Sequence, residues 1–226
     1  MKPGNVVLLN GTSSAGKSTT ARALQEVMDL PYVHTGVDHF LPRVPQQFFA
    51  IEDVANAHPV DYFVLLYSGV APRATAEIEG GQSVFGLSEF RGLRIGPEGI
   101  KLLAGMYSGI AGLARAGVNV IVDDVLHDQR LLRSAVEALC GLPVLLVGLR
   151  LPREVAERRE RERGDRGPGA ATAFYDLVHT HVIYDLELDT SVLGPQECAQ
   201  RIKGALQKGR SGQAFQQLHA LLARST

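Results

Sequence analysis

The sequence predicts an α/β protein in which helices cover both faces of a five-stranded parallel sheet, a three-layer sandwich. Five short apolar segments alternate with segments of helical periodicity along the chain. Alternation of this kind is typical of βαβ units, whose strands run parallel. A glycine-rich loop also joins the first apolar segment, residues 5–10, to a helical segment at residues 19–28. In open sheets of this type, ligands bind at the carboxyl ends of the strands.

The predicted strands are short runs rich in Val, Ile and Leu, bounded by Pro, Gly or acidic residues. They cover residues 5–10, 31–38, 118–125, 143–149 and 183–189. The second strand ends at Asp38, and the third ends at Asp123 and Asp124. Because the carboxyl ends of parallel strands meet at one edge of the sheet, we expect these aspartates to lie beside the glycine-rich loop.

The predicted helices have apolar residues three or four positions apart and end at recognisable stop signals. They cover residues 19–28, 98–116, 127–139, 153–163, 170–181, 194–206 and 212–223. Gly117 follows the second of these helices as a C-cap. Residues 40–97 contain five prolines and are predicted to be irregular, with short helical patches near 46–56 and 60–68.

The composition indicates one globular domain, residues 1–226, with a helical tail at about 207–226. Hydrophobic residues make up 45% of the chain, and the formal net charge of −1 gives no reason to expect a nucleic-acid partner. We expect neither a signal peptide nor a membrane span, and we expect Cys140 and Cys198 to be reduced packing residues of a cytoplasmic protein. The oligomeric state stays open.

The glycine-rich loop, Gly-Thr-Ser-Ser-Ala-Gly-Lys-Ser at residues 11–18, matches the P-loop pattern G-x-x-x-x-G-K-[ST]. Between a strand and a helix, its backbone N–H groups form a site for phosphate. Lys17 is expected to reach a terminal phosphate, and the Ser18 hydroxyl is expected to bind Mg²⁺. The residues predicted to bind ATP are Gly11, Thr12, Ser13, Ser14, Ala15, Gly16, Lys17, Ser18 and Thr19.

The paired acids at the end of the third strand are candidates for the metal site. An aspartate in this position can hold the water shell of Mg²⁺ beside Ser18. Because successive side chains of a strand alternate in direction, we expect one of Asp123 and Asp124 to face the metal and the other to cap the next helix. The alternative in which both acids cap that helix stays open, since Asp is a favoured N-cap residue.

Asp38 follows the second strand in the sequence Gly36-Val37-Asp38. A carboxylate here is placed to take the proton from an attacking hydroxyl, which is the role of the catalytic aspartate of kinases. Two other roles stay open: Asp38 can hold the substrate by a hydrogen bond without moving a proton, or it can cap a following turn.

Seven arginines and four glutamates alternate in residues 150–166. Mixed charge of this kind is usually a solvated helix face with i,i+4 ion pairs. Arg159 and Arg163, however, are four residues apart and share one face, and Arg166 lies in an adjoining glycine-rich loop. Small P-loop kinases have a mobile lid at this point, so we expect a lid at 153–169 whose Arg159, Arg163 and Arg166 act in catalysis by neutralising the transferring phosphoryl group.

Several short motifs occur in a distinctive order. After the P-loop come Gly36-Val37-Asp38, Phe90-Arg91, Ala114-Arg115-Ala116-Gly117, Ile121-Val122-Asp123-Asp124-Val125, Arg163-Gly164-Asp165-Arg166, Tyr184-Asp185, Glu187 and Asp189-Thr190. In this order the chain resembles the chloramphenicol phosphotransferase family of small P-loop kinases over about residues 5–200. The resemblance implies a P-loop kinase fold and an ATP-dependent kinase that phosphorylates a primary hydroxyl, with Asp38 as base. It also suggests a role in antibiotic inactivation.

The predicted acceptor region, residues 40–97, does not closely match the antibiotic-binding part of that family. Its aromatic residues are Phe40, Phe48, Phe49, Tyr62, Phe63, Tyr67 and Phe85, and residues of this type are mostly core. The acceptor is therefore predicted only as a small hydroxylated molecule. Two alternatives stay open: a regulatory ATPase without an acceptor, and a kinase of a sugar nucleotide whose phosphate is held by Arg91 or Arg94.

Overall fold

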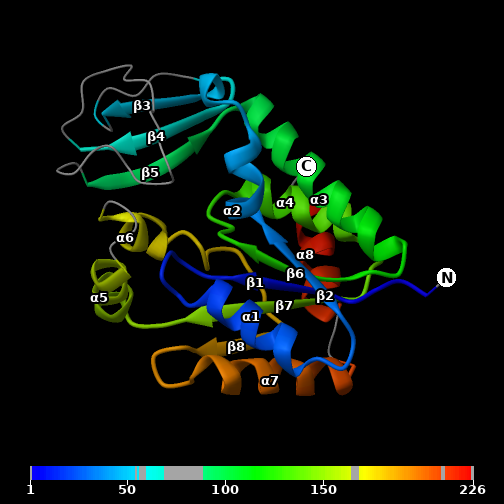
Figure 1. The fold of residues 1–226 in the computed structure, drawn as a ribbon. Coiled ribbons are helices and arrows are strands. Elements are labelled where there is room, and N and C mark those ends of the chain that lie inside the picture. The colour runs from blue at the N-terminus through cyan, green and yellow to red at the C-terminus, as the bar shows by residue number, and fades with distance from the viewer. Residues whose placement is uncertain are drawn as a thin grey trace.

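A computed structural model describes residues 2–53, 55, 60–68, 89–163, 168–209 and 212–224. Its middle layer is a five-stranded sheet in the order β2-β6-β1-β7-β8, with every neighbouring pair parallel (Figure 1). The strands are β1 (Val6–Asn10), β2 (Tyr32–Gly36), β6 (Asn119–Asp124), β7 (Val144–Arg150) and β8 (Leu186–Asp189). The predicted parallel sheet is confirmed, with β1 at its centre and all five β1 residues buried.

Helices cover both faces of this sheet and confirm the three-layer sandwich (Figure 1). On one face, Val7 and Leu9 of β1 pack with α1 (Lys17–Val27) and α7 (Pro195–Gln207). On the other face, Val6 and Leu8 belong to a core built by α3 (Pro97–Arg115), α4 (Gln129–Leu139) and α8 (Gln213–Leu222). The alternating side chains of one buried strand thus supply both cores.

Helix α8 is packed into the sandwich. The Gly212 N–H donates to the Val144 carbonyl at 2.5 Å, and the Ala214 N–H donates to Asp185 Oδ1 at 2.9 Å. Phe215 and Leu218 of α8 are buried among the side chains of α3 and α4. Among the described residues, no helix is long and apolar enough to cross a membrane.

A second, three-stranded sheet lies beyond the carboxyl ends of the main strands (Figure 1). It consists of β3 (Phe49–Asp53), β4 (Phe63–Tyr67) and β5 (Phe90–Ile95), and the short helices α2 (Val37–Phe40), η1 (Leu41–Arg43) and η2 (Gln46–Phe48) lead into it. Strands β3 and β4 run parallel, whereas β4 and β5 run antiparallel. The prediction of an irregular region with helical patches is therefore wrong for these strands. A short apolar run such as Phe-Val-Leu-Leu-Tyr does not distinguish a buried strand from a helix by periodicity.

Three predicted boundaries also differ from the structure. Helix α4 begins at Gln129, because the Asp128 side chain caps it by accepting from the Arg130 N–H. Helix α6 (Ala170–Tyr175) stops six residues before the predicted end at 181, and β8 begins at Leu186 and not at 183. Helix α5 (Arg153–Arg163) follows the prediction, and with α6 it lies at the carboxyl edge of the main sheet (Figure 1).

Candidate active site

A cavity of about 850 Å³ lies at the carboxyl edge of the main sheet. Its walls come from the P-loop and α1, from α2, from β5, from the segment after β6, from α5 and α6, and from the segment that joins β8 to α7. The strand ends therefore bring together segments from most of the chain, as the topology predicts.

The P-loop forms one end of the cavity. Ser13, Ser14 and residues 16–19 line it, whereas Gly11, Thr12 and Ala15 of the predicted set do not. Gly16 has φ 84°, a left-handed conformation that L side chains rarely adopt, so glycine suits this turn into α1. The Lys17 Nζ donates to the Thr12 carbonyl at 3.0 Å and thereby lies across the loop.

Asp123 faces the P-loop. Its Oδ2 accepts from the Ser18 hydroxyl at 2.5 Å, and its Oδ1 lies 4.0 Å from Lys17 Nζ. Burial alone raises the pKa of this carboxyl, but the neighbouring His34, Lys17 and Ser18 outweigh it, so the pKa lies below its usual value. Asp123 therefore presents an ionised carboxylate beside the Ser18 hydroxyl.

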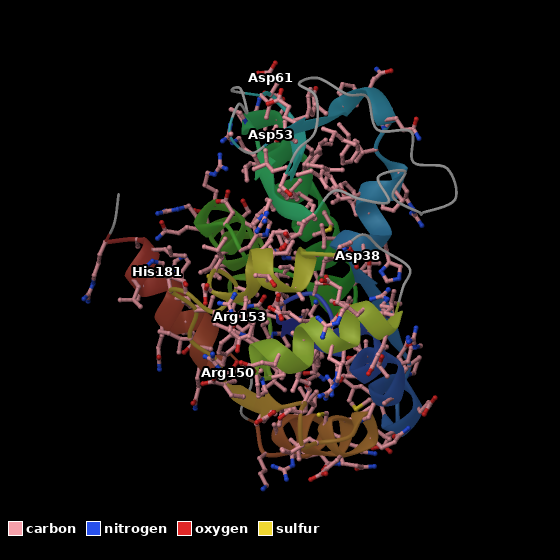
Figure 2. The ribbon with its side chains drawn as sticks, turned by 90° about the vertical axis from the view of Figure 1, so that its left-hand side faces the viewer. Asp38, Asp53, Asp61, Arg150, Arg153 and His181 are labelled. Carbon is pink, nitrogen blue, oxygen red and sulfur yellow. The ribbon has the colours of Figure 1, made fainter. Side chains whose placement is uncertain are left out.

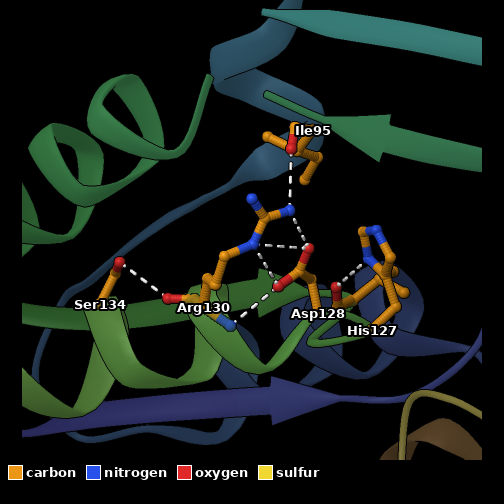
Figure 3. A network of polar contacts seen from close by, with 6 residues as sticks. Ile95, His127, Asp128, Arg130 and Ser134 are labelled. Carbon is orange, nitrogen blue, oxygen red and sulfur yellow. Dashed lines mark hydrogen bonds and ion pairs between the residues drawn. The ribbon is translucent and has the colours of Figure 1, made fainter. Parts of the chain in front are cut away.

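Asp124, unlike Asp123, is part of the cavity lining, but its side chain bonds to α3 and not to the P-loop. It is fully buried, and its Oδ2 accepts from the Tyr107 hydroxyl of α3. Burial raises the pKa of Asp124 to about 6. The expectation that one of the two acids caps the next helix is wrong. The N-cap of α4 is Asp128, which directly precedes the first helical residue, Gln129. Figure 3 shows Asp128 also paired with Arg130, which donates to the Ile95 carbonyl at 2.8 Å.

Asp38 is exposed and lines the cavity as the second residue of α2. Figure 2 shows it between the three-stranded sheet above and α1 below. The position of Asp38 depends on the close approach of β2 to β6 at Gly36. A Cβ on Gly36 would lie only 1.9 Å from the Asp123 carbonyl oxygen, so any larger residue would push the strands apart. Gly36 itself occupies the N-cap position of α2, so Asp38 is not the cap of this helix.

Two of the predicted lid arginines line the cavity, namely Arg159 and Arg163. The Arg159 Nη2 donates to the Thr190 carbonyl at 2.7 Å. Arg166 and its glycine-rich loop lie outside the described residues. The solvated-face interpretation holds for three other arginines, which pair with acids at the surface: Arg150 with Glu187, Arg153 with Asp176, and Arg158 with Glu162.

The end of the cavity beyond Asp38 is mainly apolar. Its lining includes Val37, Leu41, Leu93, Ile95, Leu103, Leu131 and Phe174. The six described aromatic residues of the predicted acceptor region do not line it. Four of them, Phe40, Phe49, Tyr62 and Phe63, pack in or against the core that α3 and α4 build, where Phe49 stacks on Phe63. Phe85 lies outside the described residues. Arg91 and Arg94 are also not in the lining, and Arg91 pairs with Glu89 at 2.7 Å.

Three histidines of this cavity were missed from the sequence. The rings of His34 and His39 are 4.8 Å apart beside Asp38, and His34 Nε2 lies 3.6 Å from Asp123 Oδ2. The His127 ring packs against Phe174, and burial lowers its pKa. The sequence could have pointed to His34 and His39, because they lie on either side of the Gly36-Val37-Asp38 motif. Among the described residues, no cluster of three or more acidic, His or Cys side chains can hold a metal by itself.

Asn10 anchors the start of the P-loop. Its Oδ1 accepts from the Leu126 N–H at 2.9 Å, and its Nδ2 donates to the Val178 carbonyl and to the Tyr184 hydroxyl, each at 2.7 Å. The Tyr184 hydroxyl in turn lies 2.7 Å from His179 Nδ1. Burial, with the nearby Arg150 charge, lowers the pKa of His179 to about 4, so the imidazole is neutral at neutral pH.

We expect this network to make stability depend on pH. Between pH 6.5 and pH 4 the unfolded chain binds a proton at residue 179 that the folded chain does not, so stability falls as the pH falls. After allowance for the partly exposed ring, the loss at pH 5 is about 1 kcal/mol, or about 2–4 °C in Tm. The Tm difference between wild type and His179→Asn should therefore be smaller at pH 5 than at pH 7.5. An equal difference at both values would contradict the assigned pKa.

Known proteins match both the sequence and the fold. A model of the chloramphenicol phosphotransferase-like protein family matches residues 4–207. The chain belongs to this chloramphenicol phosphotransferase-like family. A family relative from Mycobacterium tuberculosis (strain H37Rv), which carries the provisional name O-phosphotransferase, is 31% identical over 218 residues, or 96% of this chain and 89% of the relative. The resemblance inferred from the motifs is confirmed.

Two solved structures share the fold of this family member. An APS kinase of M. tuberculosis, in complex with AMPPNP and APS, has 14% identity and a TM-score of 0.55 over 92% of this chain and 99% of that one. A sugar kinase from Janibacter sp. has 16% identity and a TM-score of 0.58 over 91% and 95%. The chain therefore has the fold of small P-loop kinases. Family and fold together support a phosphotransferase that acts on a small molecule.

Proposed function

We propose that this protein transfers the γ-phosphate of ATP to a hydroxyl of a small, largely apolar acceptor. One observation carries the proposal: Lys17 of the P-loop and Asp38 line the same cavity, with the lid residues Arg159 and Arg163 beside them. Phosphate-binding groups, a carboxylate and an apolar wall thus border one continuous space. A kinase needs this arrangement, because the two substrates must meet away from bulk water.

In the proposed reaction the oxygen of the acceptor hydroxyl bonds to the γ-phosphorus, and Asp38 accepts the proton of that hydroxyl. The bond from that phosphorus to the β-phosphate oxygen breaks, and ADP and the phosphorylated acceptor leave. Lys17 and Arg159 neutralise the charge that spreads over the transferring oxygens. Asp38 is exposed to the cavity in the free enzyme, so an acceptor hydroxyl can approach its carboxylate.

Mg²⁺ fits the oxygen ligands at the P-loop. Ser18 Oγ and the ionised Asp123 lie 2.5 Å apart, and these two groups would hold the ion together with nucleotide phosphates. When bound, Mg²⁺ neutralises phosphate charge. Asp124 faces Tyr107 and not Ser18, so we assign the metal to Asp123.

The apolar wall favours the kinase over a regulatory ATPase, which needs an ordered water and no acceptor space. It also favours an uncharged acceptor over a sugar nucleotide, because the arginines considered for holding a second phosphate lie outside the cavity lining. The family name makes chloramphenicol and other hydroxylated antibiotics the first candidates to test.

The deciding experiment is a screen for acceptor-dependent ADP release. Purified protein with Mg·ATP is offered hydroxylated antibiotics, sugars and nucleosides, and hits are checked by mass spectrometry for a phosphorylated product. We expect ADP release to depend on the acceptor and to match product formation. Steady ADP release without any acceptor would instead identify a regulatory ATPase.

We expect Arg159→Ala to lower kcat by about 10²-fold, because one preorganised donor to transition-state charge typically contributes about that much. The KM of the acceptor should change little. Arg158→Ala, next to it on α5 and paired with Glu162 at the surface, is the matched control and should keep the wild-type kcat. Normal turnover by Arg159→Ala would show that its contact with Thr190 is only structural.

A further inference from the structure

Among the charged residues of α5, all of which the structure describes, Glu160 is the one that is buried. In α5, Arg-Glu-Val-Ala-Glu-Arg-Arg-Glu-Arg-Glu-Arg, the buried residues are Ala156 and Glu160. They are four residues apart and therefore share one face, which packs against α6. A buried carboxylate destabilises the fold unless hydrogen bonds satisfy it, so its partners reveal its role.

Both oxygens of Glu160 accept hydrogen bonds from the backbone at the start of α6. Oε2 accepts from the Gly169 N–H at 2.8 Å, and Oε1 accepts from the Ala171 N–H at 2.7 Å. Hydrogen bonds to an ionised acceptor are about twice as strong as neutral ones. Glu160 thus ties the start of α6 to the middle of α5.

The segment that Glu160 holds also contacts the P-loop and the second sheet. The buried Thr12 hydroxyl of the P-loop donates to the Ala171 carbonyl at 2.8 Å. On the other side, the Phe90 N–H at the start of β5 donates to the Pro168 carbonyl at 2.8 Å. Residues 168–171 are therefore bonded to the P-loop, to the second sheet and, through Glu160, to the lid helix.

This anchor fixes how α5 is rotated about its own axis. Neighbouring residues of a helix point about 100° apart, so holding Glu160 against α6 sets the directions of Arg159 and Arg163. Arg159 is close to the P-loop: its Nη1 lies 4.0 Å from where a Cβ on Gly16 would be. A small rotation of α5 would move this guanidinium away from the phosphate site.

We propose that Glu160 is a positioning residue for phosphoryl transfer, which holds Arg159 and Arg163 over the P-loop by binding the Gly169 and Ala171 amides. The inference rests on the proposed function. Glu160 itself does not line the cavity and acts through the arginines.

The test is Glu160→Gln, which keeps the size of the side chain. An amide replaces one of the two oxygens by an NH₂ group, which is a donor and would face one of the two N–H groups. We expect kcat to fall by about tenfold to 10²-fold, since displacement of a catalytic group by about 1 Å can have that effect. The acceptor KM should stay within about twofold. Kinetics are measured at a temperature where circular dichroism shows both proteins folded.

Glu157→Gln is the matched control on the same helix. Glu157 accepts one hydrogen bond, from the Thr172 hydroxyl at 3.0 Å, and an amide oxygen can accept that bond equally. We expect the wild-type kcat for this variant.

Glu160→Gln is also measured in a variant that already carries Arg159→Ala and Arg163→Ala. There the substitution should lower kcat by less than about threefold, because the arginines that Glu160 positions are absent.

A wild-type kcat for Glu160→Gln would overturn this inference and leave the proposed function intact. So would a kcat that Glu160→Gln lowers by the same factor in the presence and in the absence of the two arginines. If Glu160→Gln does not fold, Glu160→Asp takes its place, because its shorter side chain cannot reach both amides. A wild-type kcat for Glu160→Asp would likewise overturn the inference. A wild-type enzyme that phosphorylates no acceptor would overturn the proposed function and this inference together.

Discussion

We expect Asp38→Asn to lower kcat by about 10²- to 10⁴-fold, the usual loss when a general base is removed. The amide keeps the shape of the side chain and can still bond a hydroxyl, so acceptor affinity should weaken only modestly. ATP affinity should hardly change, because the groups expected to bind the nucleotide belong to the P-loop, which Asp38 is not part of. Steady-state kinetics and thermal unfolding are measured on the same preparation.

Asp61→Asn is a suitable control for this variant. Asp61 is exposed and lies at the far end of the second sheet, away from Asp38 (Figure 2). It should keep the wild-type kcat. If Asp38 had only a structural role, its loss would lower stability by about 1 kcal/mol and leave the rate unchanged. A destabilised but fully active Asp38→Asn enzyme would refute the assignment of the base.

Lys17→Ala should abolish detectable phosphoryl transfer while the protein stays folded. The Lys17 ammonium crosses the P-loop to the Thr12 carbonyl and lies 4.0 Å from Asp123, where it meets the phosphates of a bound nucleotide. Its removal takes away charge from the site of transfer and not from the core. The measurement is product formation with Mg·ATP, together with a Tm.

Lys203→Ala provides a close structural match for Lys17→Ala. Lys203 on α7 also binds a backbone carbonyl, that of Val27 at 2.7 Å, and an aspartate, Asp29 at 2.7 Å, but it is not in the cavity lining. This variant should lose some stability and keep its rate. Full turnover by Lys17→Ala would remove the P-loop from the mechanism.

The main sheet was predictable from the sequence because its signals are local. Strands β1, β6 and β7 contain compact apolar runs. Gly16 has a left-handed backbone, and Gly36 lies where β2 approaches β6 too closely for a larger residue. The second sheet was not predictable, because β4 pairs with β5 across more than twenty residues and neither strand has an alternating pattern. The pairing of the strands in the second sheet is set by tertiary contacts, which residue propensities for strand formation do not reflect.

The candidate site was predictable at the positions where a sequence motif specifies the residue. Lys17, Ser18 and Asp38 line one cavity as expected, and Asp123 bonds to Ser18 beside it. The direction of Asp124 depends on Tyr107, a contact from another helix. Glu160 looks the same in sequence as the three other glutamates of α5. Only the position of α6 shows which of the four is buried.

The arrangement of the second sheet also bears on how readily acceptor choice can be re-engineered. Among the described residues of its three strands, only Leu93 and Ile95 line the cavity, and both belong to β5. A mutant library aimed at new acceptors can therefore concentrate on these two positions with Val37, Leu41 and Leu131, and leave β3 and β4 untouched as a supporting frame. Selection for new substrates would then proceed without disturbing the residues that handle phosphate.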